Sequence, residues 1–230
     1  MLKLSSGGSA MDAIECIKTR MSVRKYKPDP VPADLLKKII SAAQRSPSYK
    51  NSQPWEVAIV SGEKKEQLSN ILIDLLESGE APAPDIPEPQ SWPQEIDARI
   101  QKTFLEKNAK FGVDIYDPDL LKKAKRANFR FYGAPHGLLI FQDRDLPLWS
   151  LFDAGLFCQS IMLAAHAEGV GTVPQAFVID YSAQIRKFIG IPDTKRLVLA
   201  ISAGFPAPVD PAKLYTTGRE PMDAVTRWIE

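Results

Sequence analysis

The chain has 230 residues, enough for one large domain, and its 44% apolar and 25% charged residues are typical of a globular protein. Its 29 basic and 28 acidic residues give a net charge of +1, so overall charge gives no reason to expect nucleic acid or a membrane surface as a partner. The two cysteines (Cys16, Cys158) and two histidines (His136, His166) argue against a disulfide framework or a metal site, and both histidines are expected to be structural.

The N-terminus has no apolar signal core, and no apolar run approaches the ~20 residues needed to cross a bilayer. The stretch SSGGSA within residues 1–10 is interpreted as part of a flexible leader, and Met11 is a candidate native start. We therefore expect a cytoplasmic protein with a leader at 1–10 and a single domain over 11–230.

The first third of the chain predicts two helices joined by an extended segment. Residues 11–19 form the first helix, with Ile14 and Ile17 on one face, and RMSVRKY (20–26) is extended. After three prolines, Pro32 is placed to open the second helix, which Pro47 stops. The apolar residues of this second helix share one face: Leu35, Leu36, Ile39, Ile40 and Ala43.

The remaining elements alternate irregularly. They comprise a short buried strand at 55–60, a helix closed by Gly79, a proline-rich extended loop, polar helices at 94–111 and 118–130, a strand at 137–141, a helix at 149–168, and two more strands flanking the helix YSAQIRKFIG. This order predicts an α+β fold with one small sheet wrapped by helices, and an insertion at about 80–130 within the same domain.

The helix at 149–168 is apolar nearly all round, from Leu151 to Ala164. Such a helix is buried on both sides. In a chain of this length, the second side is a candidate contact with another subunit.

Standard nucleotide-binding and hydrolase motifs are absent from the sequence. The basic segment contains Arg20, Ser22 and Arg24 at a spacing of two, which on an extended segment places all three side chains on one face. Two guanidiniums that flank a hydroxyl suit a dianionic phosphate. By spacing alone, a solvated basic face is the more frequent alternative.

The loop SPSYKNSQPW (46–55) is rich in small hydrogen-bonding groups between two core elements. Hydroxyls and an amide can approach a flat heterocycle closely and bond its edge. The alternative is an ordinary capped loop, in which serine and asparagine satisfy their own backbone.

In combination, these segments resemble the nitroreductase family of FMN-dependent oxidoreductases. The resemblance extends over nearly the whole chain from Met11, including GVGTVPQAF and the tail GREPMDAV, and NFRFYGAPHGLLIF is similar to the nitrobenzoate-reductase branch. It implies a small antiparallel sheet wrapped by helices and an intertwined homodimer with two FMN sites at its interface.

The resemblance also implies which residues bind FMN. The basic segment, which includes Met21, is expected to bind the phosphate and ribityl groups, with Arg24 closest to the ring. The loop at 47–51 is expected to reach the partner's FMN. The segment at 174–176 is expected to lie along the isoalloxazine. The implied cofactor-binding residues are Arg20, Met21, Ser22, Arg24, Pro47, Ser48, Tyr49, Asn51, Asn128, Arg130, Pro174, Gln175, Ala176 and Arg219.

One position departs from the family pattern, because many members carry Glu or Cys near Gln175. The neutral side chain leaves the preference between NADH and NADPH open. The insertion is expected to roof the substrate pocket, with packing inside the insertion as the alternative for its aromatic residues: Trp92, Tyr116, Phe129, Phe131 and Tyr132.

The resemblance implies that NAD(P)H reduces FMN, which then reduces a nitroaromatic or quinone-like acceptor in the same cleft by a ping-pong mechanism. No catalytic side chain and no metal are expected, since the flavin carries the chemistry. The alternatives are reductive dehalogenation, flavin fragmentation, or a non-catalytic module that binds FMN.

Overall fold

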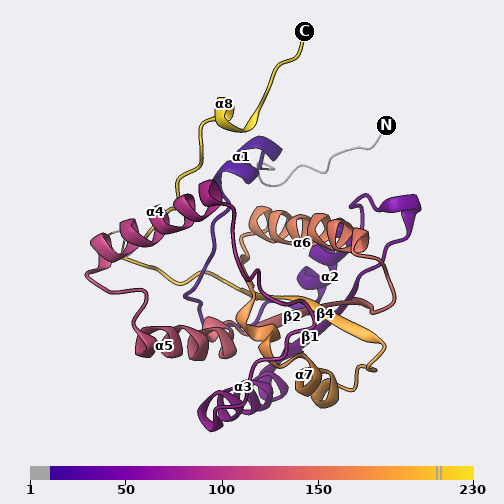
Figure 1. The fold of residues 1–230 in the computed structure, drawn as a ribbon. Helices are drawn as coiled ribbons and strands as arrows, with labels where there is room; N and C mark the ends of the chain where they lie inside the picture. Colours follow the sequence, from indigo (N-terminus) through magenta and orange to yellow (C-terminus); the bar gives the residue numbers. More distant parts are fainter. Residues whose placement is uncertain (1–10, 211, 213) are drawn as a thin grey trace. The chain divides into compact units, whose positions relative to one another are not determined.

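The computed structural model describes residues 11–210, 212 and 214–230, so the expected leader at 1–10 lies outside the described residues. The chain divides into two compact units (Figure 1). The first comprises Met1–Glu88 and Lys122–Pro208, and the second comprises Pro89–Leu121 and Val209–Glu230.

The first unit is built around the small antiparallel sheet that the sequence predicts. Its strands are β1 (Glu56–Ser61), β2 (His136–Asp143), β3 (Gly171–Gln175) and β4 (Lys195–Gly204), in the order β1-β2-β4-β3. All three neighbouring pairs are antiparallel. The α+β prediction is therefore confirmed. The expectation of a buried first strand was wrong, because β1 lies at an edge of the sheet and only Val60 in it is buried.

Helices cover both faces of the central strands. On β2, Leu138 and Ile140 pack into one apolar cluster, whereas Leu139 and Phe141 pack into another, as the alternation of side chains along a strand requires. This burial of both faces explains why the sequence GLLIF has no polar alternation.

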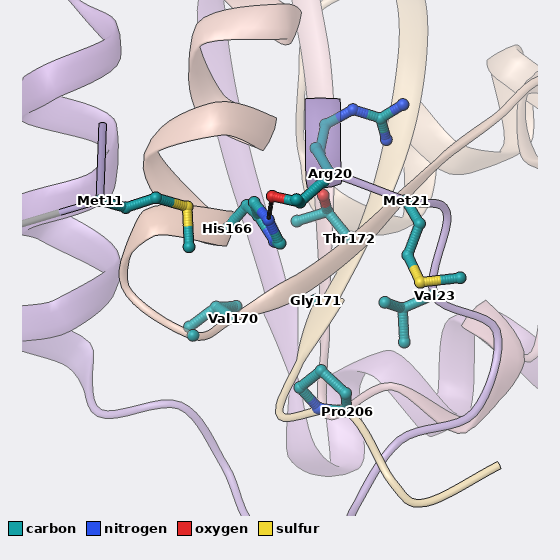
Figure 2. A pocket seen from close by; sticks show the side chains of 11 residues that line it. Met11, Arg20, Met21, Val23, His166, Val170, Gly171, Thr172 and Pro206 are labelled. Carbon is teal, nitrogen blue, oxygen red and sulfur yellow. Dashed lines mark hydrogen bonds between the residues drawn. The ribbon is translucent and has the colours of Figure 1, made fainter. Parts of the chain in front are cut away.

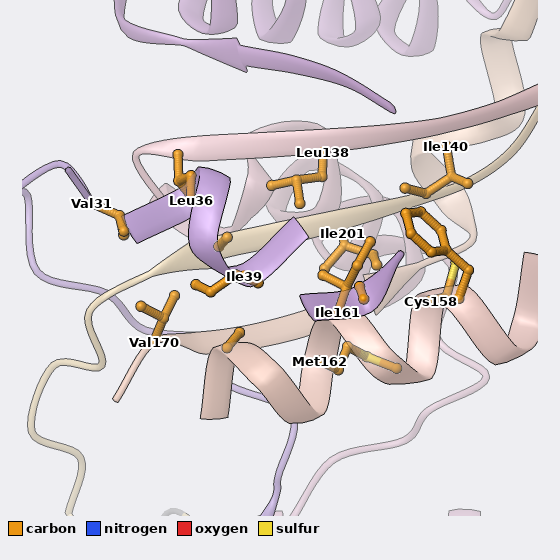
Figure 3. Close-up of a cluster of buried hydrophobic side chains, with 14 residues drawn as sticks. Val31, Leu36, Ile39, Leu138, Ile140, Cys158, Ile161, Met162, Val170 and Ile201 are labelled. Atoms are coloured by element: carbon orange, nitrogen blue, oxygen red, sulfur yellow. The ribbon is translucent and has the colours of Figure 1, made fainter. Parts of the chain in front are cut away.

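One face of the sheet is covered by α2 (Ala33–Ala43) and α6 (Trp149–Ala167), as Figures 1 and 3 show. The ring of Phe157 is fully buried and stacks on Trp55, with centroids 4.5 Å apart and an interplanar angle of 1°. Pro32 is the N-cap of α2 and so precedes the helix instead of opening it.

The opposite face is covered by α3 (Gly62–Ser78), η3 (Phe177–Tyr181) and α7 (Ser182–Ile189). Gly79 caps α3 in the left-handed conformation, as expected. Phe129 and Phe131 are fully buried in the cluster on this face, so these two rings are core side chains and do not line a pocket.

Two helices, α1 and α6, expose large apolar side chains. In α1 (Ala13–Thr19), Ile14 and Ile17 are exposed and Cys16 is the buried residue. In α6, Trp149 and Phe152 are 60% and 63% exposed. Within the first unit, therefore, only one side of α6 is covered.

The loop after α3 is fixed to the first unit by Asp85. Its carboxylate accepts hydrogen bonds from Arg144 Nη2 at 2.8 Å and from the Leu197 N–H at 2.7 Å, and it also pairs with Arg186. Buried charges are stable where they are paired in this way. Residues 80–88, which begin the predicted insertion, thus belong to the sheet-bearing unit.

The second unit contains α4 (Gln94–Phe111), the start of α5 (Pro118–Phe129) and α8 (Met222–Val225). The chain near residue 215 packs on α4: the Tyr215 hydroxyl donates to Glu106 at 2.7 Å, and its ring meets Phe111 at 6.4 Å. Both polar helices predicted between 94 and 130 are confirmed.

Candidate functional site

The basic segment runs alongside β3. Ser22 forms a parallel bridge with Thr172, and the Val23 N–H donates to the Thr172 carbonyl at 3.0 Å. A Cβ on Gly171 would lie 2.7 Å from the Val23 side chain, so a glycine is needed for this close approach. The extended segment and the end of β3 therefore lie together, as expected for the two parts of one site.

Arg20 follows α1 directly and is half-buried. Its Nη1 is buried and has no hydrogen-bond partner among residues 11–210, 212 and 214–230. Figure 2 shows the guanidinium extending away from Val170 and Pro206, which line a cavity of about 340 Å³ beside the segment. A buried guanidinium nitrogen requires an acceptor, and an anionic phosphate oxygen fits this requirement.

Arg24 lies next to a strained turn that precedes β2. Its guanidinium carbon is 5.8 Å from the centre of the Tyr132 ring. Within η2 (Phe131–Gly133), Phe131 and Tyr132 have φ values of 52° and 54°. Left-handed backbone at residues other than glycine costs ~1–2 kcal/mol each and is frequent at functional sites.

The expected ring-side residues differ in exposure. Pro174 and Ala176 are exposed at the end of β3, whereas the Gln175 side chain is only 1% exposed. Its Nε2 donates to the backbone oxygen of Asn128 at 2.9 Å, so the Gln175 side chain is turned away from the surface that Pro174 and Ala176 share. Arg130, two residues after Asn128, is exposed.

The polar loop contains η1 (Tyr49–Asn51) and docks on the N-terminal half of α6. The Tyr49 N–H donates to both carboxylate oxygens of Asp153 at 3.2 Å, and the Ser46 hydroxyl donates to Ser160 at 2.7 Å. Three residues other than glycine in this loop have positive φ values, namely Lys50, Asn51 and Gln53. The loop is thus ordered, strained and largely exposed.

Within one chain, the loop and the basic segment are held at different ends of α6. Asp153 holds the loop, whereas the Leu163 carbonyl accepts a bond from Cys16 in α1 at 3.4 Å. Ten residues of helix separate these two anchors, which is about 15 Å along the axis. Figure 1 shows α1 and the loop at opposite ends of α6. Within one chain, the loop and the helix that precedes Arg20 are therefore anchored about 15 Å apart along α6.

Arg219 belongs to the second unit, unlike the other predicted site residues. Its Nη1 donates to the Thr217 hydroxyl at 2.8 Å and to the Gly218 carbonyl at 2.8 Å. With Arg99 and Lys102 it lines a cavity of about 250 Å³ in that unit.

Two further titratable groups, His136 and Cys158, are buried in the first unit. His136 is buried, its Nε2 accepts the Val31 N–H at 2.9 Å and its Nδ1 bonds the Ser61 hydroxyl at 2.5 Å. Burial lowers the pKa of His136 and raises the pKa of the Cys158 thiol to about 12. Among the described residues, no cluster of metal-ligating side chains occurs, and none of the described helices is long and apolar enough to cross a membrane.

Sequence reasoning missed three residues that shape the site. Gly171 and Thr172 hold the basic segment, and Asp153 holds the polar loop. Asp153 had a usable signal, because it is the one acidic residue in this largely apolar helix. The pairing of β3 with the segment at 20–26 left no trace in local sequence, because it depends on residues about 150 positions apart.

Residues 17–205 match the model of a family described as the Nitroreductase family. Nitroreductase NfnB of Mycolicibacterium smegmatis is 30% identical over 204 residues, which cover 85% of this chain and 83% of that protein. The 4-nitrobenzoate reductase of Pseudomonas putida is 31% identical over 194 residues, covering 82% and 83%. A crystal structure of the FMN-dependent nitroreductase NfnB from Mycobacterium smegmatis in complex with NADPH has a TM-score of 0.88 at 28% identity, covering 95% of this chain and 98% of that one.

Proposed function

Because this chain belongs to the nitroreductase family, we propose that it is an FMN-dependent oxidoreductase that uses NAD(P)H to reduce nitroaromatic or quinone-like acceptors. The observation that carries the proposal is the buried Nη1 of Arg20, which has no partner among the described residues. A phosphate oxygen supplies the acceptor that this nitrogen lacks.

The chain's own residues bind and orient the cofactor. Arg20 and Ser22 hold the phosphate and ribityl groups, and Arg24 places a positive charge at the edge of the ring. Pro174 and Ala176 are exposed at the end of β3, where a flat ring can lie against them. When bound, FMN supplies the redox chemistry, taking up hydride from NAD(P)H and passing electrons to the acceptor.

A homodimer completes the site in this proposal. The loop residues reach the FMN of the second chain, because their anchor Asp153 lies about 15 Å along α6 from Leu163, which anchors α1 ahead of the basic segment. These loop residues are Pro47, Ser48, Tyr49 and Asn51. The exposed Trp149 and Phe152 give α6 an apolar face for that second chain to cover. The single domain and the cytoplasmic localisation stay predictions. The same holds for cofactor binding by five further residues: Met21, Asn128, Arg130, Gln175 and Arg219.

The identity of the hydride donor is part of the proposal. The NfnB crystal structure was solved with NADPH, and several curated relatives are named nitroreductases or nitrobenzoate reductases. We therefore expect NADPH with a nitroaromatic carboxylate such as 4-nitrobenzoate to be a productive pair. Gln175 does not decide between NADH and NADPH by direct contact, because its side chain is buried.

Three measurements on the purified protein test the proposal. Heat should release a yellow flavin that co-migrates with FMN, and anaerobic NADPH should bleach its visible absorbance. Addition of 4-nitrobenzoate should then restore the oxidised spectrum over many cycles, with parallel lines in a double-reciprocal plot. A protein that binds FMN but cycles only once is a binding module. Release of an aryl halide or cleavage of the flavin would favour the other superfamily chemistries.

A further inference from the structure

A chain of buried amides links Gln175 to the hydroxyl of Tyr132. Gln175 Nε2 donates to the backbone oxygen of Asn128 at 2.9 Å and to Asn128 Oδ1 at 3.3 Å. Asn128 Nδ2 in turn donates to the Ala124 carbonyl at 2.9 Å and to the Tyr132 hydroxyl oxygen at 3.0 Å. Asn128 and Gln175 are 6% and 1% exposed, so water does not compete for these bonds.

Two backbone carbonyls, which can only accept, fix the direction of each of these hydrogen bonds. The Asn128 carbonyl requires the NH₂ end of the Gln175 amide to face it, so Gln175 also donates to Asn128 Oδ1. The Ala124 carbonyl requires the NH₂ end of the Asn128 amide on its own side. The Tyr132 oxygen therefore accepts from Asn128, and its single proton points elsewhere.

No protein acceptor faces that proton within the described part of the chain. The ring is half-buried and lies beside the Arg24 guanidinium, which is 5.8 Å from its centre. The strained backbone is held by its neighbours: the Phe131 ring fills the space above Gly137, and the Phe131 carbonyl accepts the Ser202 hydroxyl at 3.0 Å. Strain of this kind persists only where the surroundings impose it.

We propose that Tyr132 is a specificity-determining donor of the nitroreductase site, and that Gln175 and Asn128 are positioning residues that set the direction of its hydroxyl. The ligand group is an electron-rich oxygen or nitrogen on a planar conjugated molecule, which lies against both the Tyr132 hydroxyl and the Arg24 guanidinium. This inference rests on the proposed function, and the atom belongs either to the flavin ring or to the acceptor.

The chain of amides also gives the departure at position 175 a mechanism. A carboxylate in place of the Gln175 amide cannot donate, so the Asn128 backbone oxygen and Asn128 Oδ1 would both lose their hydrogen bonds from residue 175. The Asn128 amide, which donates to the Tyr132 oxygen, would then no longer be held in place by residue 175. The Gln175→Glu substitution thus releases the Tyr132 hydroxyl from the orientation in which it donates to the ligand.

The test measures two dissociation constants for each folded variant. One is that of FMN for the apoprotein, and the other is that of 4-nitrobenzoate for the oxidised holoprotein without NAD(P)H, followed by flavin absorbance. Tyr132→Phe should raise one of them about three- to tenfold, the worth of one hydrogen bond. A change in the first assigns the atom to FMN, and a change in the second assigns it to the acceptor.

Two further variants separate positioning from general damage. Tyr181→Phe removes a phenol that donates to the Glu80 carbonyl at 3.1 Å, and it should leave both constants within about twofold. Gln175→Glu should act like Tyr132→Phe and add nothing to it in the double variant, because both remove the same bond. Constants unchanged by Tyr132→Phe, or fully multiplicative effects in the double variant, would overturn the inference. Failure of the parent protein to bind FMN would instead show the proposed function itself to be wrong.

Discussion

If each flavin site uses two chains, inactive variants from opposite sides of the site should complement each other. Arg20→Ala removes the buried guanidinium from one side of the site. Asn51→Gly removes the loop amide from the other, and glycine keeps the left-handed backbone that Asn51 adopts at φ 57°. Either homodimer should lack flavin at both of its sites.

The heterodimer separates the two arrangements because of the geometry of α6. The anchors at Asp153 and Leu163 are about 15 Å apart along the helix, so Asn51 and Arg20 of one chain serve different sites. In a heterodimer, one site then carries both substitutions and the other carries neither. About half of the parental activity and about one FMN per dimer should return.

The assay co-expresses the two variants with different affinity tags and purifies the mixed dimer on both tags in turn. Flavin content is read from absorbance, and turnover is measured with NADPH and 4-nitrobenzoate. If Arg20 and Asn51 served one site within a chain, each site of the heterodimer would carry one substitution and no flavin would return. A parent protein that sediments as a monomer with full flavin occupancy would also refute the reasoning.

Four more predictions concern single side chains. Arg20→Ala should weaken FMN binding by about 2–4 kcal/mol, or ~30- to 1000-fold by fluorescence titration, and Arg20→Lys should weaken it less. If Arg20→Ala binds FMN as tightly as the parent, the segment is a solvated basic face. Phe152→Glu, on the exposed side of α6, should split the dimer in sedimentation velocity while the circular dichroism spectrum stays folded, whereas Phe157→Ala should lower the free energy of unfolding by about 3–5 kcal/mol, because the Phe157 ring is fully buried. Burial lowers the pKa of His136, so the unfolded chain binds a proton there more readily, and stability should fall as pH drops below about 6.5. In thermal melts, a His136→Gln variant should lose this part of the pH dependence. An unchanged slope of stability against pH in that variant would contradict the prediction.

The apolar central helix shows what the sequence could predict and what it could not. Its continuous apolar character predicted a long buried helix at 149–168, and α6 spans Trp149–Ala167. The sequence could not say which side faces the sheet, because every side is apolar. The fold decided this: Phe157 packs on Trp55, while Phe152 is left exposed.

The same contrast holds at the site. Local sequence determined the extended segment with Arg20, Ser22 and Arg24, because charge, spacing and the following prolines act over a few residues. It also determined where most helices begin and end, through caps such as Gly79. These features depend on near neighbours along the chain and are therefore readable from it.

Only the tertiary structure decided what these side chains meet. The bridge from Ser22 to Thr172 and the bond from Gln175 to Asn128 join residues 150 and 47 positions apart, and no local pattern encodes either pairing. Gln175 shows the consequence: the family resemblance implied a residue beside the cofactor, whereas the bond from its side chain to Asn128 turns that side chain into the core. The backbone conformation of one strand and the carbonyl of a distant helix together set which way that amide points, because a buried donor must meet an acceptor.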